Sequence, residues 1–238
     1  MTMSRLSRFV GASLLVALIA SCGPKDKPIP ADPKARSEFL AVAAAKLTPD
    51  ERNLLNRFIS RLDAQAAAGD APPKVAVPRA LELQRSYETQ VTDARRNYQT
   101  TLEAANADLA IDVRDATVVM SDKARPAGDK ALRYVINVNN RGQRTIEQFA
   151  LRLEFRDASG KYQAAIPNLE LSGSLRPGET GRSVQTLPLD AQHHQYILDG
   201  RPLQIFAYPS RIVYAGGENL EPGKELQTME SLHRTKIE

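Results

Sequence analysis

The apolar pattern of this 238-residue chain changes its period near residue 110, and no other feature constrains the fold as strongly. Before that point apolar residues recur every three or four positions, which is the spacing of one face of an α-helix. After it apolar and polar residues alternate, which is typical of a half-buried β-strand. The sequence therefore predicts an α+β protein, with a helical segment over residues 33–108 and an antiparallel β-sandwich over residues 109–217.

The helical segment carries start and stop signals for two short helices and one long helix. Asp-Pro at residues 32–33 can begin the first, residues 48–51 (Thr-Pro-Asp-Glu) form a capping-box pattern before the second, and Gly69 can end it. The third should begin near Pro78, and its apolar stripe has a mean step of about 3.6 residues, which favours a straight helix packed on the chain over a coiled-coil dimer. The stripe comprises Ala80, Leu83, Tyr87, Val91, Ala94, Tyr98, Leu102, Ala105 and Leu109.

Alternation is clearest over residues 131–138 and 149–156. In the second segment the apolar side chains should face the core, while Arg152, Glu154 and Arg156 should face solvent and offer a surface for a partner. About seven short strands in roughly 110 residues are typical of a sandwich. The other strands are expected around residues 111–120, 169–171, 183–187, 203–208 and 212–214, with turns at 139–142, 157–160, 176–179 and 215–217.

Residues 1–21 have the pattern of a secretory signal, with Arg5 and Arg8 before an apolar run that is too short to span a membrane. The run ends in residues 19–22, Ile-Ala-Ser-Cys, which resemble the bacterial lipobox, although Leu is more usual at the first of these positions. The resemblance implies cleavage between Ser21 and Cys22, then a diacylglyceryl group on the sulfur and an acyl chain on the new amine. Cys22 is the chain's one cysteine, so it has no disulfide partner within the chain. The alternative is a thiol that is merely free or buried.

A lipobox cysteine with several acyl chains is a lasting membrane anchor, at about 0.8 kcal/mol for each buried methylene. Gly23 stands where aspartate would mark inner-membrane retention in many Gram-negative lipoproteins. The resemblance therefore implies the periplasmic face of the outer membrane. Residues 22–32 are expected to form an extended tether, since the stretch 23–33 contains four prolines. Residues 218–238 are expected to form a C-terminal tail.

Two further resemblances concern the folded part. Residues 109–216 resemble the immunoglobulin-like sandwich of FxLYD-type bacterial envelope domains, although "LEFRD" stands where the naming Phe-x-Leu-Tyr-Asp stretch would be. This resemblance implies an immunoglobulin-like fold. The helical segment is similar to small proteobacterial envelope lipoproteins of unassigned function, which implies no catalytic residue. The residues that match the first pattern are Asp157, Gly160, Leu175, Pro177, Gly178 and Glu179.

No pattern for catalysis, metal binding or cofactor binding is found. The chain lacks a glycine-rich phosphate loop, a His-Glu-x-x-His helix and a Gly-x-Ser-x-Gly elbow. Adjacent His193 and His194 should turn different ways, and with Asp190 they are too few for a zinc site. Removing residues 1–21 leaves 30 of the 32 basic residues against 28 acidic ones, with no basic stripe for nucleic acid. We therefore expect no metal, no cofactor and no nucleic-acid partner.

The function that fits these observations is a non-enzymatic lipoprotein that binds another envelope protein as an adaptor. Exposed sheet edges would offer that partner a place to add a strand. One alternative is an inhibitor or immunity lipoprotein against a hydrolase or toxin that attacks the envelope. A less favoured alternative is an envelope hydrolase, which would need a concave pocket with converging polar groups.

Overall fold

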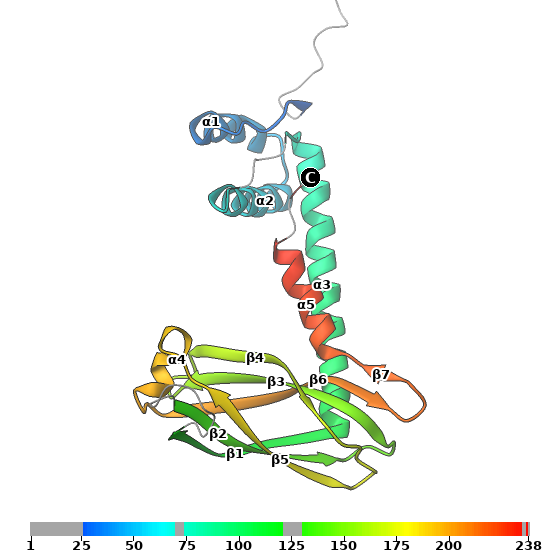
Figure 1. Cartoon of the computed structure of the whole chain (residues 1–238). Coiled ribbons are helices and arrows are strands. Elements are labelled where there is room, and N and C mark those ends of the chain that lie inside the picture. The colour runs from blue at the N-terminus through cyan, green and yellow to red at the C-terminus, as the bar shows by residue number, and fades with distance from the viewer. Residues whose placement is uncertain (1–25, 70–73, 121–129, 235–236, 238) are drawn as a thin grey trace, which may run out of the picture. The chain divides into compact units, whose positions relative to one another are not determined.

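The computed structural model describes residues 26–69, 74–120, 130–234 and 237, which fall into two compact units (Figure 1). The first unit contains the described residues up to Gln90 together with Ile237, and the second contains Val91–Arg234. The boundary between the units lies inside a helix, α3 (Val77–Asp108), and not between residues 108 and 109 as the change of period suggested. The predicted signal peptide, its cleavage site at Ser21 and the lipidation site at Cys22 lie outside the described residues.

The first unit contains α1 (Pro33–Ala44), α2 (Pro49–Ala67) and the beginning of α3. The predicted caps are confirmed. The Asp32 carboxylate accepts a hydrogen bond from the Ala35 N–H at 2.8 Å. Thr48 and Glu51 form the reciprocal capping box, in which the Glu51 N–H donates to the Thr48 hydroxyl at 3.2 Å and the Thr48 N–H to the Glu51 carboxylate at 3.0 Å. Each such cap stabilises a helix by about 1 kcal/mol.

The core of the first unit joins α1, α2, α3 and two segments outside the helices. Ile29, in the segment predicted to be a free tether, is buried, and its N–H donates to the Val75 carbonyl at 2.8 Å. Ile237, in the segment predicted to be a tail, is also buried, and its N–H donates to the Gln65 side chain at 3.1 Å. Both are isolated apolar residues in polar surroundings, which is why no periodic pattern identified them. The helices contribute Ala43, Leu54, Leu55, Phe58, Leu62, Val77, Ala80 and Leu81.

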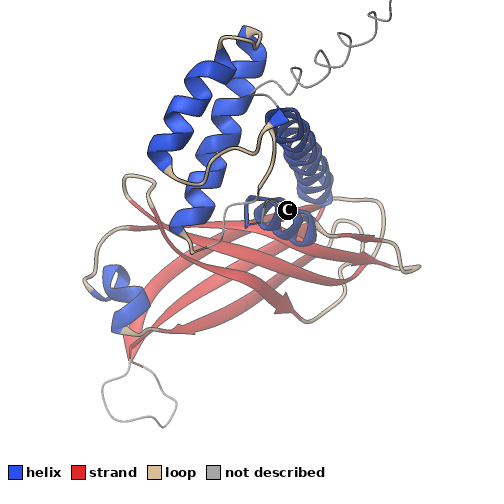
Figure 2. Ribbon diagram, turned by 90° about the horizontal axis from the view of Figure 1, so that it is seen from above, coloured by secondary structure: helices blue, strands red, loops and turns tan. Residues whose placement is uncertain are grey.

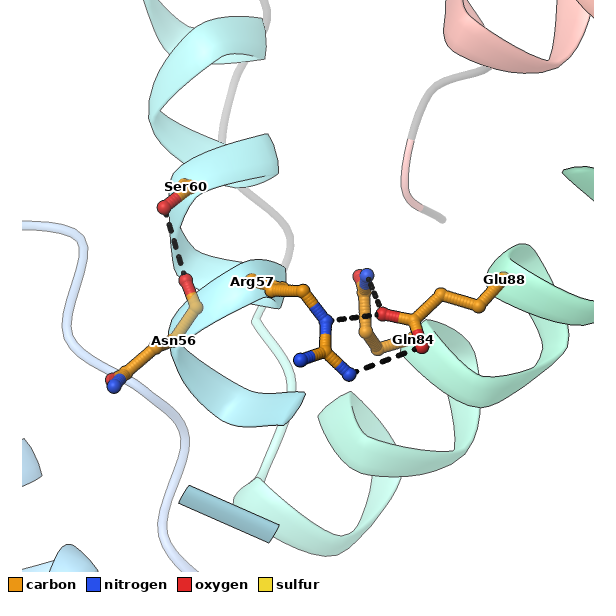
Figure 3. Close-up of polar contacts among 5 residues, drawn as sticks. All are labelled: Asn56, Arg57, Ser60, Gln84 and Glu88. Carbon is orange, nitrogen blue, oxygen red and sulfur yellow. Dashed lines mark hydrogen bonds and ion pairs between the residues drawn. The ribbon is translucent and has the colours of Figure 1, made fainter. Parts of the chain in front are cut away.

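Polar side chains join α2 to α3 at the edge of this core (Figure 3). The Arg57 guanidinium donates to both oxygens of Glu88, at 2.6 and 3.1 Å, and the Gln84 amide donates to the same carboxylate at 2.8 Å. The hydrogen bond from Arg57 is the main reason why the pKa of Glu88 lies below its usual value. Because Arg57 and Glu88 are well exposed, the pair adds little stability and mainly fixes the alignment of the two helices.

The second unit is built on two antiparallel sheets with seven strands in its described residues, which confirms an α+β fold with a sandwich (Figures 1 and 2). One sheet has the order β1 (Leu109–Met120), β2 (Lys130–Asn140), β5 (Thr180–Pro188). The other has the order β4 (Tyr162–Leu171), β3 (Ile146–Asp157), β6 (Leu203–Tyr214), β7 (Asn219–Leu220). The unit also contains the end of α3 and two further helices, α4 (Ala191–Leu198) and α5 (Pro222–Arg234).

The sandwich core forms between the two sheets, as the alternation predicted. Tyr134 of β2 meets Phe155 of β3 edge to face, with ring centroids 6.5 Å apart. Ile197 of α4, the short helix at the left of Figure 2, is buried in the same core. Most buried side chains come from β2, β3 and β6: Leu132, Tyr134, Ile136, Val138, Ile146, Phe149, Leu151, Leu153, Phe155, Ile212 and Tyr214.

The end of α3 is joined to the sandwich by a charged hydrogen bond. The buried Tyr214 hydroxyl donates to the Asp108 carboxylate at 2.5 Å, and burial together with this bond raises the pKa of Tyr214. The guanidinium of Arg144 lies 3.6 Å from the centroid of the Tyr214 ring. Gly142 is required here, because a Cβ at that position would lie 2.8 Å from the Asp108 side chain. The end of α3 at Asp108 is thus fixed to the sandwich, and β1 begins at the next residue without a linker.

Burial of Tyr134 makes the second unit sensitive to alkali. Burial raises the pKa of Tyr134 from 10.0 to about 12, so the unfolded chain releases the phenolic proton first as the pH rises. The free energy of unfolding should therefore fall between about pH 10 and about pH 12. Urea titrations of wild type and Tyr134→Phe through this range, with unfolding followed by a probe placed in the second unit, should show a shallower pH dependence in the variant. Tyr162→Phe is the control, since Tyr162 is 52% exposed, and equal slopes in all three proteins would contradict the prediction.

Two further segments differ from their predictions. Residues 203–208 and 212–214, predicted as two strands, form the single strand β6, which bulges where Pro209 pairs with Leu151 and Arg211 with Ala150. Residues 218–238, predicted as a tail, contain β7 and α5. Both pack or pair with β6, a contact with another part of the chain that was not anticipated from the sequence. No helix among the described residues is long and apolar enough to cross a membrane.

Candidate functional site

The surface predicted for a partner lies on β3, in the interior of the four-stranded sheet. Arg152, Glu154 and Arg156 all point away from the core, as predicted, but their side chains are only 20%, 15% and 38% exposed. The face that these side chains form is therefore only partly open to solvent. Tyr98 of α3 and Leu226 of α5 line the space beside Arg152 and cover part of the face. Alternation showed the direction of these side chains but not what covers them.

The three charges of this face pair with one another and leave a net charge of +1. The Arg152 Nε lies 3.1 Å from one oxygen of Glu154, and an Arg156 Nη lies 2.7 Å from the other. Burial alone would raise the pKa of Glu154, but the hydrogen bonds and charges of Arg156 and Arg152 outweigh it and hold that pKa below its usual value. The carboxylate is thus ionised at neutral pH and occupied by its own strand. A partner would have to compete with these pairs.

A cavity of about 330 Å³ opens beside Arg152 between the sheet and α5. Its floor is formed where the two strands that flank β3 bulge, at Pro167 and Asn168 in β4 and at Ser210 in β6. Across β3, the Ser210 hydroxyl donates to the Asn168 side chain at 3.1 Å, and Arg211 pairs with Glu170 at 3.1 Å over the small buried side chain of Ala150. The lining residues are Arg152, Pro167, Asn168, Ser210, Arg211, Glu221, Gly223, Lys224, Leu226, Gln227 and Glu230.

The three cations around the cavity already have carboxylate partners, so they select no ligand class. Arg152 and Arg211 are paired with carboxylates of the sheet, and Lys224 lies 3.7 Å from Glu221, the residue before α5. Such a lining can hold a polar segment of a partner or water. It does not place a nucleophile next to a base, which acyl transfer or general base catalysis would require.

Both adjacent histidines turn toward Asp190, contrary to the expectation that they would diverge. The Nδ1 atoms of His193 and His194 lie 2.9 and 3.1 Å from the two oxygens of that carboxylate. This is possible because the backbone leaves the helical conformation at His194, with φ −124° and ψ 18°. Asp190 also caps α4, and the hydrogen bond from the His193 N–H is the main cause that lowers its pKa. Within the described ranges no group of three or more side chains suits a metal ion.

The edges of the two sheets differ in how they are protected. β1 has a register break after Arg114, with Asp115 in a left-handed conformation at φ +53°, and β4 has two register breaks. β7 is only two residues long. By contrast, β5 pairs with β2 in one continuous register over all nine residues and carries one charged side chain, Arg182. Bulges, charges and short length are the devices that keep edge strands from pairing, so β5 is the least protected edge.

Sequence reasoning expected open edges in general but did not identify β5. Its residues Thr-Gly-Arg-Ser-Val-Gln-Thr-Leu-Pro alternate between exposed and half-buried positions, a pattern that the sequence shows only weakly because few of them are strongly apolar. Which strand ends a sheet depends on strand order, and the sequence carries no local signal for that.

Comparisons with known proteins identify no family for this chain. No family model matches it, and no curated protein matches it. The putative ApaA protein from Bordetella pertussis is 17% identical, covering 48% of this chain and 85% of that one with a TM-score of 0.30. A protein from Archaeoglobus fulgidus is 11% identical, covering 44% and 83% with a TM-score of 0.25. Similarity this low supports no conclusion about fold or function.

Proposed function

We propose that this chain is a lipoprotein of the outer membrane, anchored through Cys22 at the periplasmic face, that binds another envelope protein without catalysing a reaction. The proposal of an anchor rests on the lipobox-like residues 19–22 and on the apolar run before them. The proposal of protein binding rests on one structural observation, the continuous and nearly uncharged edge of β5.

For a protein anchored to the membrane, a binding surface of modest affinity is sufficient. Holding the chain at the membrane restricts it to the same layer as its partner, which raises the effective concentration of each for the other. A sheet edge supplies backbone donors and acceptors that bind an extended segment in one register. The charged face on β3 is a weaker candidate surface, because its arginines already pair with Glu154.

The anchor is tested in cells by following acylation and fractionation of tagged wild type, Cys22→Ala and Gly23→Asp. Wild type should incorporate labelled fatty acid and collect in the outer membrane. Cys22→Ala should lose the label and the membrane association, since no other residue can form the thioether. Gly23→Asp should keep the label and move to the inner membrane. Wild type without the label, or Cys22→Ala that fractionates as wild type does, would refute the anchor.

Cross-linking in living cells tests the binding function. Proteins cross-linked to tagged wild type are identified by mass spectrometry beside those from Cys22→Ala. A partner captured by wild type and lost from Cys22→Ala would show that binding needs the anchor. A partner kept by both would show that the anchor only delivers the protein. The proposed function fails if no envelope protein is captured by either.

A further inference from the structure

The register of β2 and β5 shows which backbone groups of β5 are free. Two hydrogen bonds at the ends of this pair fix the alternation: the Asn140 N–H donates to the Glu179 carbonyl, and the Leu189 N–H donates to the Lys130 carbonyl, both at 3.0 Å. The register between them is unbroken, and in antiparallel pairs bonded and non-bonded positions alternate. The odd-numbered residues of β5 therefore bond to β2, and the even-numbered residues direct their N–H and C=O to the open edge.

The residues whose backbone faces the open edge are Arg182, Val184 and Thr186 near the middle of β5. All three side chains are exposed, Val184 at 48%, and lie on the outer face of the sheet. Pro188 follows the same parity and has no N–H, which an edge position tolerates. Within the described residues, no backbone hydrogen bond connects these three positions to any segment.

The charge beside this edge is positive. Arg182 lies in register with Asn137, and Arg133 of β2 lies in register with Thr186 on the same outer face. Both arginines are exposed, and in the described part of the chain neither takes part in an ion pair. Arg114 on β1, by contrast, pairs with Asp112. The β5 side of this face is therefore the side with unpaired positive charge.

We propose that the open edge of β5 binds an extended, acidic segment of the partner protein as a fourth strand of the β1-β2-β5 sheet. This rests on the proposed function and names the surface and the chemistry of the partner. Cross-strand neighbours set the side-chain pattern, so the segment carries Asp or Glu opposite Arg182 and a β-branched or aromatic residue opposite Val184. These two residues stand at positions i and i+2 of the segment, because every second side chain of a strand lies on the same face.

A second copy of this chain fits the edge less well. An antiparallel pair of β5 strands centred on Val184 would place Arg182 opposite Thr186 of the other copy. Both Arg182 side chains would then stay without a carboxylate, whereas an acidic segment pairs with this arginine. The charge therefore favours a different protein as the occupant.

The test uses the mature acylated protein in detergent micelles with two synthetic peptides. The first peptide has Glu at the position opposite Arg182, Val at the position opposite Val184 and Thr at the position between them. The second peptide has Lys in place of Glu. The acidic peptide should bind and slow hydrogen exchange at the edge-facing amides of residues 182, 184 and 186. It should bind at least about tenfold more tightly than the lysine peptide, and Arg182→Glu should reverse that order.

Val184→Pro is the decisive variant, because it removes one edge-facing N–H and leaves the odd-numbered bonds to β2 intact. Val184→Thr is its matched control, since it keeps the N–H and nearly the same shape. Val184→Pro should weaken the acidic peptide at least about tenfold, while Val184→Thr should stay within about threefold. Retained exchange protection at residues 183, 185 and 187 in Val184→Pro shows that the strand is still folded.

Three outcomes would overturn the inference: equal binding of both peptides, unchanged binding to a folded Val184→Pro, or a concentration-dependent dimer that Val184→Pro abolishes. Failure here is distinguishable from failure of the proposed function. An envelope protein that cross-links equally to wild type and Val184→Pro in cells would leave the function standing and remove β5 as its surface. Loss of acylation would remove the anchor and leave the peptide result unaffected.

Discussion

Replacing Phe58 with alanine is expected to destabilise the first unit by about 3–5 kcal/mol. The Phe58 side chain is fully buried, and it lies among side chains of α2 and α3 that form most of a small core. A whole domain is stable by only about 5–15 kcal/mol, so a loss of this size should remove a large share of the stability of the helical unit and make its opening far more frequent.

The effect should be read from hydrogen exchange of the α2 amides, since one global unfolding curve does not describe a chain with two units. Val42→Ala is the matched control. It also shortens an apolar side chain in the first unit, but Val42 is 56% exposed, so the change should stay within about 0.5 kcal/mol. The sandwich has a separate core, so exchange in β3 should not change. Wild-type protection of α2 in Phe58→Ala would contradict this account.

Asn140→Asp should be as damaging to the second unit. The Asn140 side chain is fully buried at the end of β2, where its amide donates to the carbonyls of Arg144 at 2.8 Å and Leu175 at 2.9 Å, and its oxygen accepts from the Gly142 N–H at 3.0 Å. An ionised carboxylate has no donor for either carbonyl and would face both. We expect a loss of at least about 3 kcal/mol in the free energy of unfolding.

Asn139→Asp makes the same chemical change one residue away. The Asn139 amide donates to the Thr180 hydroxyl at 2.9 Å in an exposed position, so its loss should cost less than about 1 kcal/mol. The two variants are compared by urea unfolding, which is monitored through hydrogen exchange of the β2 amides. Below about pH 4 the new carboxyl at position 140 should be neutral, and part of the lost stability should return. Equal stability of the two variants at neutral pH would contradict the role of Asn140.

The candidate surfaces show where sequence reasoning succeeded and where it failed. Alternation correctly predicted that Arg152, Glu154 and Arg156 point away from the core, because the direction of a side chain on a strand is a local property. It could not show that Tyr98 and Leu226 lie beside Arg152, because those residues come from α3 and α5. The anchor at Cys22 was predicted from sequence alone and stays a prediction.

What the sequence determined by itself is the content of the two halves: helices with their caps at Asp32 and Thr48, then strands with two-residue alternation. These depend on contacts within a few residues along the chain. The burial of Ile29 and Ile237, the single bulged strand β6 and the position of β5 at an edge were decided only by the tertiary structure. Each depends on which distant segments pack or pair, and packing energy between segments leaves no periodic trace in the residues that supply it.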